Sequence, residues 1–145
     1  MKSYIIAYIV TLAVFVAIDS VWLGTMADRL YRPAMGDMLA PDFRLAPAVL
    51  FYLVYIAGLT FFAVRPGLAF SSLATAVFHG AALGFTAYAT YDLTNQATLK
   101  NWSTSLTVAD LIWGTFLSAF ASGAGQWITS GINGAIRQHA GNPDG

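Results

Sequence analysis

Apolar residues fill four long runs of the chain, and short polar segments separate these runs. The runs extend from about residue 4 to 27, 46 to 64, 72 to 93 and 105 to 128. A membrane-spanning helix needs about 20 predominantly apolar residues, so each run predicts one span. The first run is longer than the apolar region of a signal peptide, which is roughly 7–15 residues. We therefore expect it to be an uncleaved span.

The segments between the runs set the expected topology. Residues 28–45 combine most of the charges with several large apolar side chains. This predicts an interfacial connection that Pro33 and Pro41 interrupt and whose apolar side faces lipid. The other connections are short, which favours antiparallel neighbours. The sequence thus predicts an all-α, integral membrane four-helix bundle of up-down topology in residues 1–130, no soluble domain, and a polar C-terminal tail in residues 131–145.

Composition supports lipid as the solvent of this chain. Hydrophobic residues make up 57% of the sequence, charged residues only 10%, and the mean hydropathy is +0.63. A soluble domain carries about 25% charged residues on average. The formal net charge is zero and no basic patch occurs, which excludes nucleic acid as a partner. The absence of cysteine excludes disulfides and thiolate metal sites.

Three aspartates interrupt the apolar runs. We name the membrane face at the N-terminus side A and the opposite face side B. The alternating topology then places Asp19, Asp92 and Asp110 in the side B halves of three different spans. Lys and Arg number three on side A and four on side B, so the positive-inside rule leaves open which face is cytoplasmic.

Small and polar residues recur every four positions in the last two runs. The third run carries such a stripe at Gly80, Gly84, Tyr88 and Asp92, and the fourth run carries one at Asp110, Gly114, Ser118, Ser122 and Gln126. Small residues allow membrane helices to approach closely. We therefore expect Gly80, Gly84, Gly114, Ser118 and Ser122 to form packing faces, with both aspartates turned toward the interior.

An ionised aspartate inside hydrocarbon costs about 2.5–3.5 kcal/mol on the mildest scale, so it must be neutralised, hydrogen-bonded or hydrated. No Lys or Arg lies within a run, although Arg29, Arg32 or Lys100 could reach in from side B. The candidate ligand- or proton-binding residues are Asp19, Asp92, Asp110, Tyr88, Tyr91, Asn95, Trp22 and Trp113. Two interpretations stay open: a pocket open to side B, or polar contacts that only fix the helix register.

The pattern D-x-x-W occurs twice, at Asp19 with Trp22 and at Asp110 with Trp113. The first and fourth runs are expected to cross the membrane in opposite directions. One tryptophan would therefore lie nearer the surface than its aspartate, and the other would lie deeper. We interpret the match as chance or convergence and not as an internal repeat.

His79 is the only histidine inside a run. Small neighbours leave room for an axial bond to haem or a chlorophyll-type pigment, and a hydrogen bond to Thr75 or to a neighbouring helix is the alternative. The nucleotide-binding and hydrolase motifs of common enzymes do not occur. We therefore predict no catalytic residue and no cofactor, and an enzyme remains the least favoured class.

Four segments of the chain resemble a known family. They are AYIVTLAVFVAIDSVWLG, PAVLFYLVYIAGLTFFAVRP, AYATYDLTNQATL and SLTVADLIWGT, and they look like the small bacterial membrane proteins catalogued as domain of unknown function 2177. The resemblance covers about residues 1–122, and YATYDLTNQATL is its most specific part. It implies a four-span, multi-pass protein of the bacterial inner membrane, and it implies no activity.

Two classes of function follow. The first is a non-enzymatic membrane component or accessory subunit, whose small-residue helix faces pack in a homo-oligomer or a larger membrane complex within the lipid. The second is a carrier or channel that binds a proton or cation at the three aspartates. We favour the first class, because four short spans leave little room for alternating access and no proline interrupts the interior of a span.

Overall fold

The computed structural model describes residues 2–40 and 42–141, and all its regular elements are helical. The first helical stretch contains α1 (Lys2–Met26), the π-helical η1 (Ala27–Tyr31), α2 (Arg32–Met35) and η2 (Gly36–Met38). The second contains α3 (Leu45–Leu59), the π-helical η3 (Thr60–Val64) and α4 (Arg65–Ala69). Two single helices follow, α5 (Leu73–Thr98) and α6 (Thr104–Gly141).

Three of these stretches are long and apolar enough to cross a membrane. They are Lys2–Met38, Leu45–Ala69 and Thr104–His139. The helix α5 has 26 residues, but it is richer in Gly, Ala and Thr and does not reach the same hydropathy. The all-helical prediction is confirmed, and three of the four predicted spans lie within helices of sufficient length and hydropathy.

The helices extend further than the sequence predicted. Helical structure continues beyond residue 27 to Met38, because Pro33 lies in the first turn of α2, where a missing N–H is tolerated. The interfacial connection expected from residue 28 is therefore largely a continuation of the first helix. Gly36 ends α2 with a positive φ of 49°, which glycine adopts without strain.

The helices that contain the second and fourth predicted spans also extend beyond the apolar runs. The second was expected to close at Arg65-Pro66-Gly67, but Pro66 lies in the first turn of α4 and the helix continues to Ala69. The last helix runs to Gly141, through most of the tail predicted as polar and separate. The end of that tail, residues 142–145, lies outside the described residues.

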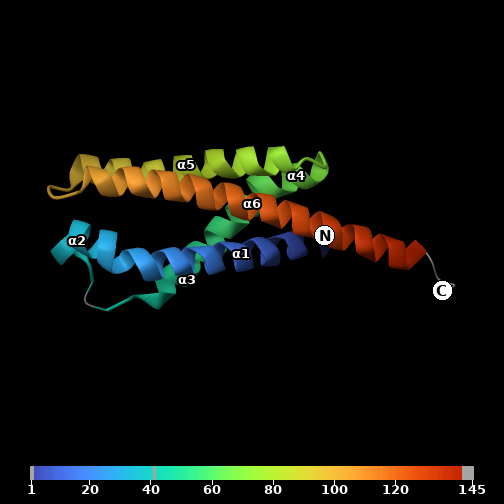
Figure 1. Cartoon of the computed structure of the whole chain (residues 1–145), viewed down its shortest axis with the longest axis horizontal. Coiled ribbons are helices and arrows are strands. Elements are labelled where there is room, and N and C mark those ends of the chain that lie inside the picture. The colour runs from blue at the N-terminus through green and yellow to red at the C-terminus, as the bar shows by residue number, and fades with distance from the viewer. Residues whose placement is uncertain (1, 41, 142–145) are drawn as a thin grey trace.

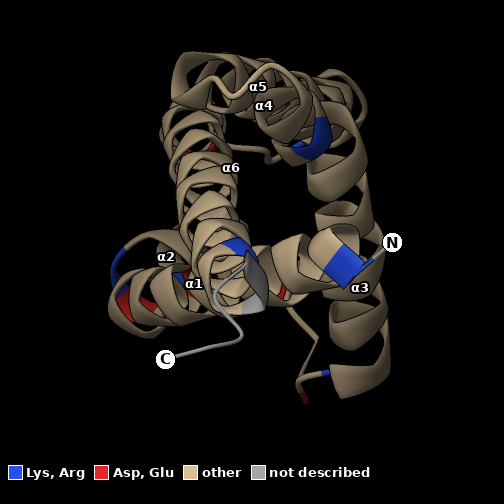
Figure 2. Cartoon of the chain, turned by 90° about the vertical axis from the view of Figure 1, so that its right-hand side faces the viewer, with Lys and Arg blue, Asp and Glu red and all other residues tan. Residues whose placement is uncertain are grey.

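Successive long helices alternate in direction along the long axis of the molecule (Figure 1). Seen along that axis, α6 lies between α5 and α1 (Figure 2), and it contacts both. The second helical stretch begins beside α1, where α3 packs, and ends beside α5, where η3 and α4 pack. The second helical stretch therefore connects the α1 side of the molecule with the α5 side.

The interior and the surface are chemically inverted relative to a soluble protein. A small apolar core joins α1, α3 and α6 through Phe15, Ile56, Leu59, Leu117 and Ala121. Polar side chains are buried beside it, among them Thr11, Asp19, Asp92, Asp110, Ser118 and Ser122. Large apolar side chains instead cover the outside, including Ile9, Leu50, Val54, Phe78, Phe85, Ile112 and Phe116. This arrangement suits a protein that lipid surrounds.

The helices α5 and α6 form the most extensive helix–helix contact of the fold. A Cβ atom added at Gly84 would lie 2.6 Å from Cβ of Ser118, and one added at Gly80 would lie 2.6 Å from Oγ of Ser122. Only glycine leaves enough room at these two positions. The small-residue stripes of the two helices therefore face each other within the chain.

Replacing Gly84 by alanine tests this contact. The new methyl group must displace the backbone of α6, so we expect Gly84→Ala to lower the free energy of unfolding by about 1–3 kcal/mol. The measurement is unfolding in mixed micelles with increasing dodecyl sulfate, followed by circular dichroism. Gly131→Ala is the matched control, because nothing lies within 4 Å of its added Cβ. Equal stability of the two variants would contradict the contact.

Candidate functional site

Asp19 joins three helices. It lies about two turns before the end of α1, on the face that also buries Thr11 and Phe15, and it is only 6% exposed. Its Oδ2 accepts a hydrogen bond of 2.7 Å from the hydroxyl of Tyr52 in α3. Its Oδ1 accepts one of 3.1 Å from the indole N–H of Trp113 in α6. Both oxygens of this carboxylate are therefore occupied by donors of the protein.

Asp110 has one donor from the protein. It is 5% exposed, and its Oδ1 accepts a hydrogen bond of 2.6 Å from the hydroxyl of Tyr31. The same hydroxyl accepts one of 3.0 Å from the indole N–H of Trp22. Tyr31 belongs to η1, so the helical extension beyond α1 supplies the donor that Asp110 requires.

The two D-x-x-W motifs face each other across α1 and α6. The rings of Trp22 and Trp113 stack with centroids 4.2 Å apart and planes 9° apart. Each tryptophan serves the aspartate of the opposite helix: Trp113 directly, and Trp22 through Tyr31. Because the helices are antiparallel (Figure 1), equal spacing on both brings the two motifs together. The pairing of the two motifs therefore gives a structural reason for their equal spacing, which a chance match would not have.

Asp92 has no donor in the described chain. It lies in α5 and is completely buried, and neither carboxylate oxygen has a hydrogen-bond partner. Tyr88, one turn before Asp92, packs beside Gly114, one turn after Asp110, so the antiparallel helices place the two aspartates opposite each other. The side chains of Tyr31, Trp22 and Trp113 connect Asp110 with Asp19. The structure thus brings the three predicted aspartates together at one end of the fold, from α1, α5 and α6.

The remaining candidates on α5 do not donate to the three carboxylates in the described residues. The ring of Tyr88 occupies the space beside Gly114. Tyr91 is 54% exposed and packs edge-on against Trp102, with ring centroids 5.7 Å apart. Asn95 lies one turn beyond Asp92 and is half-buried.

Sequence reasoning missed two donors, Tyr31 and Tyr52. The sequence analysis places Tyr31 within the interfacial connection of residues 28–45, and it does not single out Tyr52 in the second apolar run. The position along each helix is a usable signal. Tyr52 follows the start of α3 by about two turns, and Asp19 precedes the end of α1 by about two turns, so the two residues lie at a similar level of the fold. Arg32 does not reach inward, because it pairs with Asp28 at 2.9 Å on the surface.

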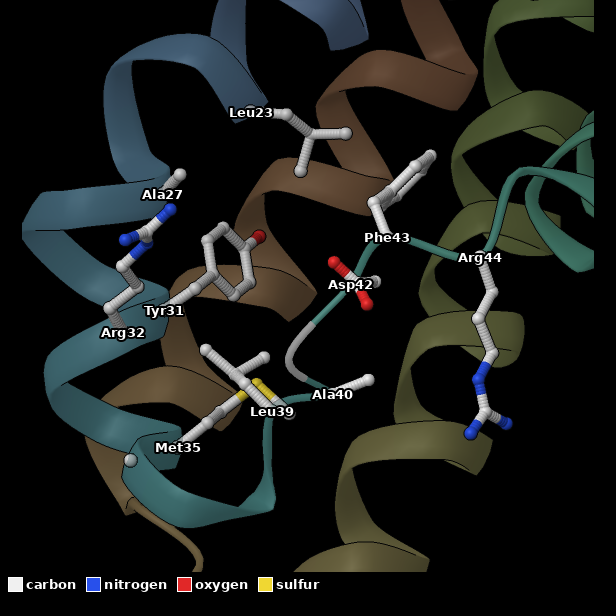
Figure 3. A pocket seen from close by; sticks show the side chains of 11 residues that line it. Leu23, Ala27, Tyr31, Arg32, Met35, Leu39, Ala40, Asp42, Phe43 and Arg44 are labelled. Atoms are coloured by element: carbon white, nitrogen blue, oxygen red, sulfur yellow. The ribbon is translucent and has the colours of Figure 1, made fainter.

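A cavity at the end of the first helical stretch leads to Tyr31. It has a volume of about 840 Å³ and lies between this helical stretch and residues 39–40 and 42–44. Figure 3 shows Tyr31 projecting between this helix and the segment that carries Asp42 and Phe43. Because its hydroxyl bonds Asp110, Tyr31 connects this cavity with the carboxylates.

His79 has a structural partner. Pro66 has no N–H to donate to the preceding turn, and the carbonyl oxygen of Phe62, four residues earlier, accepts a hydrogen bond of 3.0 Å from Nδ1 of His79. This bond leaves Nε2 without the proton in the neutral ring. Within residues 2–40 and 42–141, no group of three or more His, Asp or Glu side chains is arranged to hold a metal ion.

The bond between Tyr52 and Asp19 should stabilise the fold measurably. Tyr52→Phe removes one donor from a buried carboxylate, so we expect a loss of about 1–3 kcal/mol in unfolding free energy. Tyr8→Phe is the matched control, because the Tyr8 hydroxyl donates to the carbonyl of Leu53 at an exposed position. Dodecyl sulfate unfolding measures both. A loss for Tyr52→Phe no larger than for Tyr8→Phe would argue against the bond.

Comparison with known proteins identifies a family and no activity. No curated protein and no solved structure matches the chain. The sequence model of one family, described as "Predicted membrane protein (DUF2177)", matches residues 4–127, which include all three aspartates and both D-x-x-W motifs. The chain therefore belongs to the DUF2177 family of predicted membrane proteins.

Proposed function

We propose that this chain is a small carrier or channel that takes up a proton or a cation at Asp92 and Asp110. In this proposal α1, the α3–α4 stretch, α5 and α6 all cross the bacterial inner membrane as an up-down bundle. The alternating directions of the helices support this arrangement (Figure 1). The large apolar side chains on the outer faces of all four support it as well.

The state of Asp92 carries the proposal. A buried carboxylate without a donor has lost its hydration and gained nothing in return, and an acidic neighbour adds repulsion. A leucine at the same place would remove both costs. A bound proton or cation would compensate them, which gives a physical reason for an acid at this position. Acids inside a membrane protein commonly mark ion pathways.

Asp19 and Asp110 take different parts in the proposal. Asp19 has both oxygens bonded to Tyr52 and Trp113, so we assign it to fixing the register of the helices. Asp110 has a single donor in Tyr31, and Tyr31 also lines the cavity at the end of the first helical stretch. We therefore assign exchange with side B to the path from this cavity through Tyr31 to Asp110.

The structure weakens the alternative of a non-enzymatic membrane component. That interpretation depended on small-residue faces being free for a partner, but Gly80 and Gly84 pack against Ser118 and Ser122 inside the chain. The hydrogen bond from Nδ1 of His79 to a backbone carbonyl gives this histidine a structural role, but it leaves Nε2 available for an axial bond, so the pigment interpretation stays open. Neither alternative gives a reason for the unpartnered carboxylate of Asp92.

Labelling of introduced cysteines tests the four-span arrangement, because the natural chain has no cysteine. If α5 crosses the membrane, Ser71→Cys before it and Asn101→Cys after it lie on opposite faces. A membrane-impermeant maleimide added to intact spheroplasts should then label one variant strongly and the other only after lysis. Both residues are exposed, so equal labelling of the two in intact spheroplasts would show that α5 does not span.

Flux into vesicles tests the role of Asp92. Purified protein in liposomes with an imposed negative-inside potential should acidify a lumenal pH dye faster than protein-free liposomes, or should admit Na⁺ in the matched Na⁺ assay. Asp92→Asn should reduce this flux to the level of protein-free liposomes, because an amide does not take up the positive charge.

Asp37→Asn is the matched control for the flux assay. It makes the same chemical change at an exposed carboxylate outside the group of three aspartates, and it should keep the wild-type flux. The proposal fails if wild-type protein conducts neither ion. It also fails if Asp92→Asn retains the flux while its elution profile matches that of the wild type.

A further inference from the structure

A second cavity also borders Asp110. It lies between α3 and α5, has a volume of about 420 Å³, and is unusually aromatic. Its lining residues are Phe51, Tyr55, Ala87, Tyr88, Tyr91 and Asp110. Ala87 is the only small side chain among them, so four aromatic rings and one carboxylate decide what the cavity can bind.

Contacts with neighbouring residues hold the aromatic rings in place. Phe51 and Tyr55 stack with centroids 5.4 Å apart, and the hydroxyl of Tyr55 bonds Oγ of Ser118 at 2.8 Å. Tyr88 is packed beside Gly114, and Tyr91 rests against Trp102. The cavity therefore requires little ordering of side chains when a ligand enters, which favours binding.

The charge of the cavity selects a cation. Asp110 is its only ionisable acid or base apart from the tyrosine hydroxyls. Its Oδ1 is taken by Tyr31, and no hydrogen bond reaches its Oδ2 in the described part of the chain. The faces of aromatic rings carry negative potential and attract cations. An anion would be repelled here, and a neutral apolar ligand would leave the carboxylate unpaired.

The shape and chemistry of the lining favour an organic cation over a metal ion. Ca²⁺ takes six to eight oxygen ligands, and Mg²⁺ requires an octahedral set. This lining offers one carboxylate, tyrosine hydroxyls and four aromatic rings. Ring faces contact alkyl-substituted ammonium groups well, as in aromatic cages that bind quaternary ammonium ligands.

We propose that the cavity formed by Phe51, Tyr55, Tyr88, Tyr91 and Asp110 binds a substituted ammonium ion, with the cation between the aromatic rings and the Asp110 carboxylate. This inference rests on the proposed function, since it names the class of cation that Asp110 takes up. It also adds Phe51 and Tyr55 of α3 to the residues that bind the cation.

The surroundings of the cavity suggest two sources of such a cation. Phe51 and Tyr91 are 43% and 54% exposed on the outer sides of α3 and α5, where the proposed spans face lipid. A water-soluble amine and the ammonium headgroup of a lipid share the required chemistry. The two sources differ in whether added lipid competes for the site.

Calorimetric titration with benzyltrimethylammonium tests the site, using the full chain in uncharged dodecyl maltoside micelles. We expect saturable binding at one site per chain. Asp110→Asn should weaken it roughly ten-fold or more, because a charged partner is lost, while the amide oxygen can still accept from Tyr31. Tyr91→Leu should weaken it about 2- to 30-fold, because one aromatic face is lost.

The controls separate this site from non-specific attraction. Asp37→Asn, at an exposed position that does not line the cavity, should bind like the wild type, and benzenesulfonate, which places a negative charge on a similar ring, should not bind. Absence of binding to wild-type protein overturns the proposal, as does equal affinity of Asp110→Asn and Asp37→Asn. If Asp110→Asn fails to fold, Tyr91→Leu decides, because it changes an exposed side chain.

Two further arms identify the source and separate the two proposals. Added phosphatidylcholine should compete if the ligand is a lipid headgroup, and it should leave the affinity unchanged if the ligand is a soluble amine. Proton or Na⁺ flux that depends on Asp92, without benzyltrimethylammonium binding, removes only the organic cation. Binding that depends on Asp110, without any flux, removes only the carrier or channel activity.

Discussion

A carboxylate inside this fold must find its hydrogen-bond donors within the chain, because hydrocarbon supplies none. Asp19 meets this requirement by drawing Tyr52 of α3 and Trp113 of α6 onto α1. The apolar core of Phe15 and Leu117 lies next to this polar layer on the same helices. Apolar packing alone has little directional preference, so these two hydrogen bonds determine how the three helices are aligned along their axes.

The helix α5 is held in the fold by a different interaction, which is close backbone packing. Gly80 and Gly84 allow the backbone of α5 to approach α6 closely, and dispersion contacts between close backbones stabilise membrane helix pairs. The residues that continue this face, Tyr88 and Asp92, must then also face α6. Close packing therefore delivers Asp92 to the neighbourhood of Asp110 without providing a donor. The small residues that stabilise the pair are the reason why the unpartnered carboxylate lies where it does.

Sequence pattern predicted the helices and the inward faces but not the helix ends. A run of apolar residues indicates which part of a helix lipid can surround. The helix itself ends where its backbone hydrogen bonds end, and the apolar run does not mark that position. Pro33 and Pro66 looked like breaks, yet each lies in a first turn where its missing N–H is tolerated. At the second site, His79 also satisfies a carbonyl of the turn before the proline, a contact between helices that no local pattern contains.

The candidate site was predictable in part for a related reason. The periodicity of four placed Asp92 and Asp110 inside, and topology placed all three aspartates near one face. Their donors depend on which helices are neighbours and on how a helix continues past its apolar run. Trp113 is among the residues that the sequence analysis names, but it donates to Asp19 of another helix and not to the aspartate of its own span. Tyr31 became a donor only because the first helix extends beyond residue 27.

The three aspartates differ in how completely the protein satisfies them, and this difference is itself an argument about function. Among residues 2–40 and 42–141, Asp19 has two donors, Asp110 has one, and Asp92 has none. Fixing the register of the helices requires only a fully hydrogen-bonded carboxylate such as that of Asp19. The number of hydrogen-bond donors falls toward α5. There Asp92 and Asp110, which have the fewest donors, lie near each other, and Asp110 borders an aromatic cavity. Positive charge gains most where the protein's own donors are fewest, so the cation that we propose would be bound best at the Asp92–Asp110 end of the series.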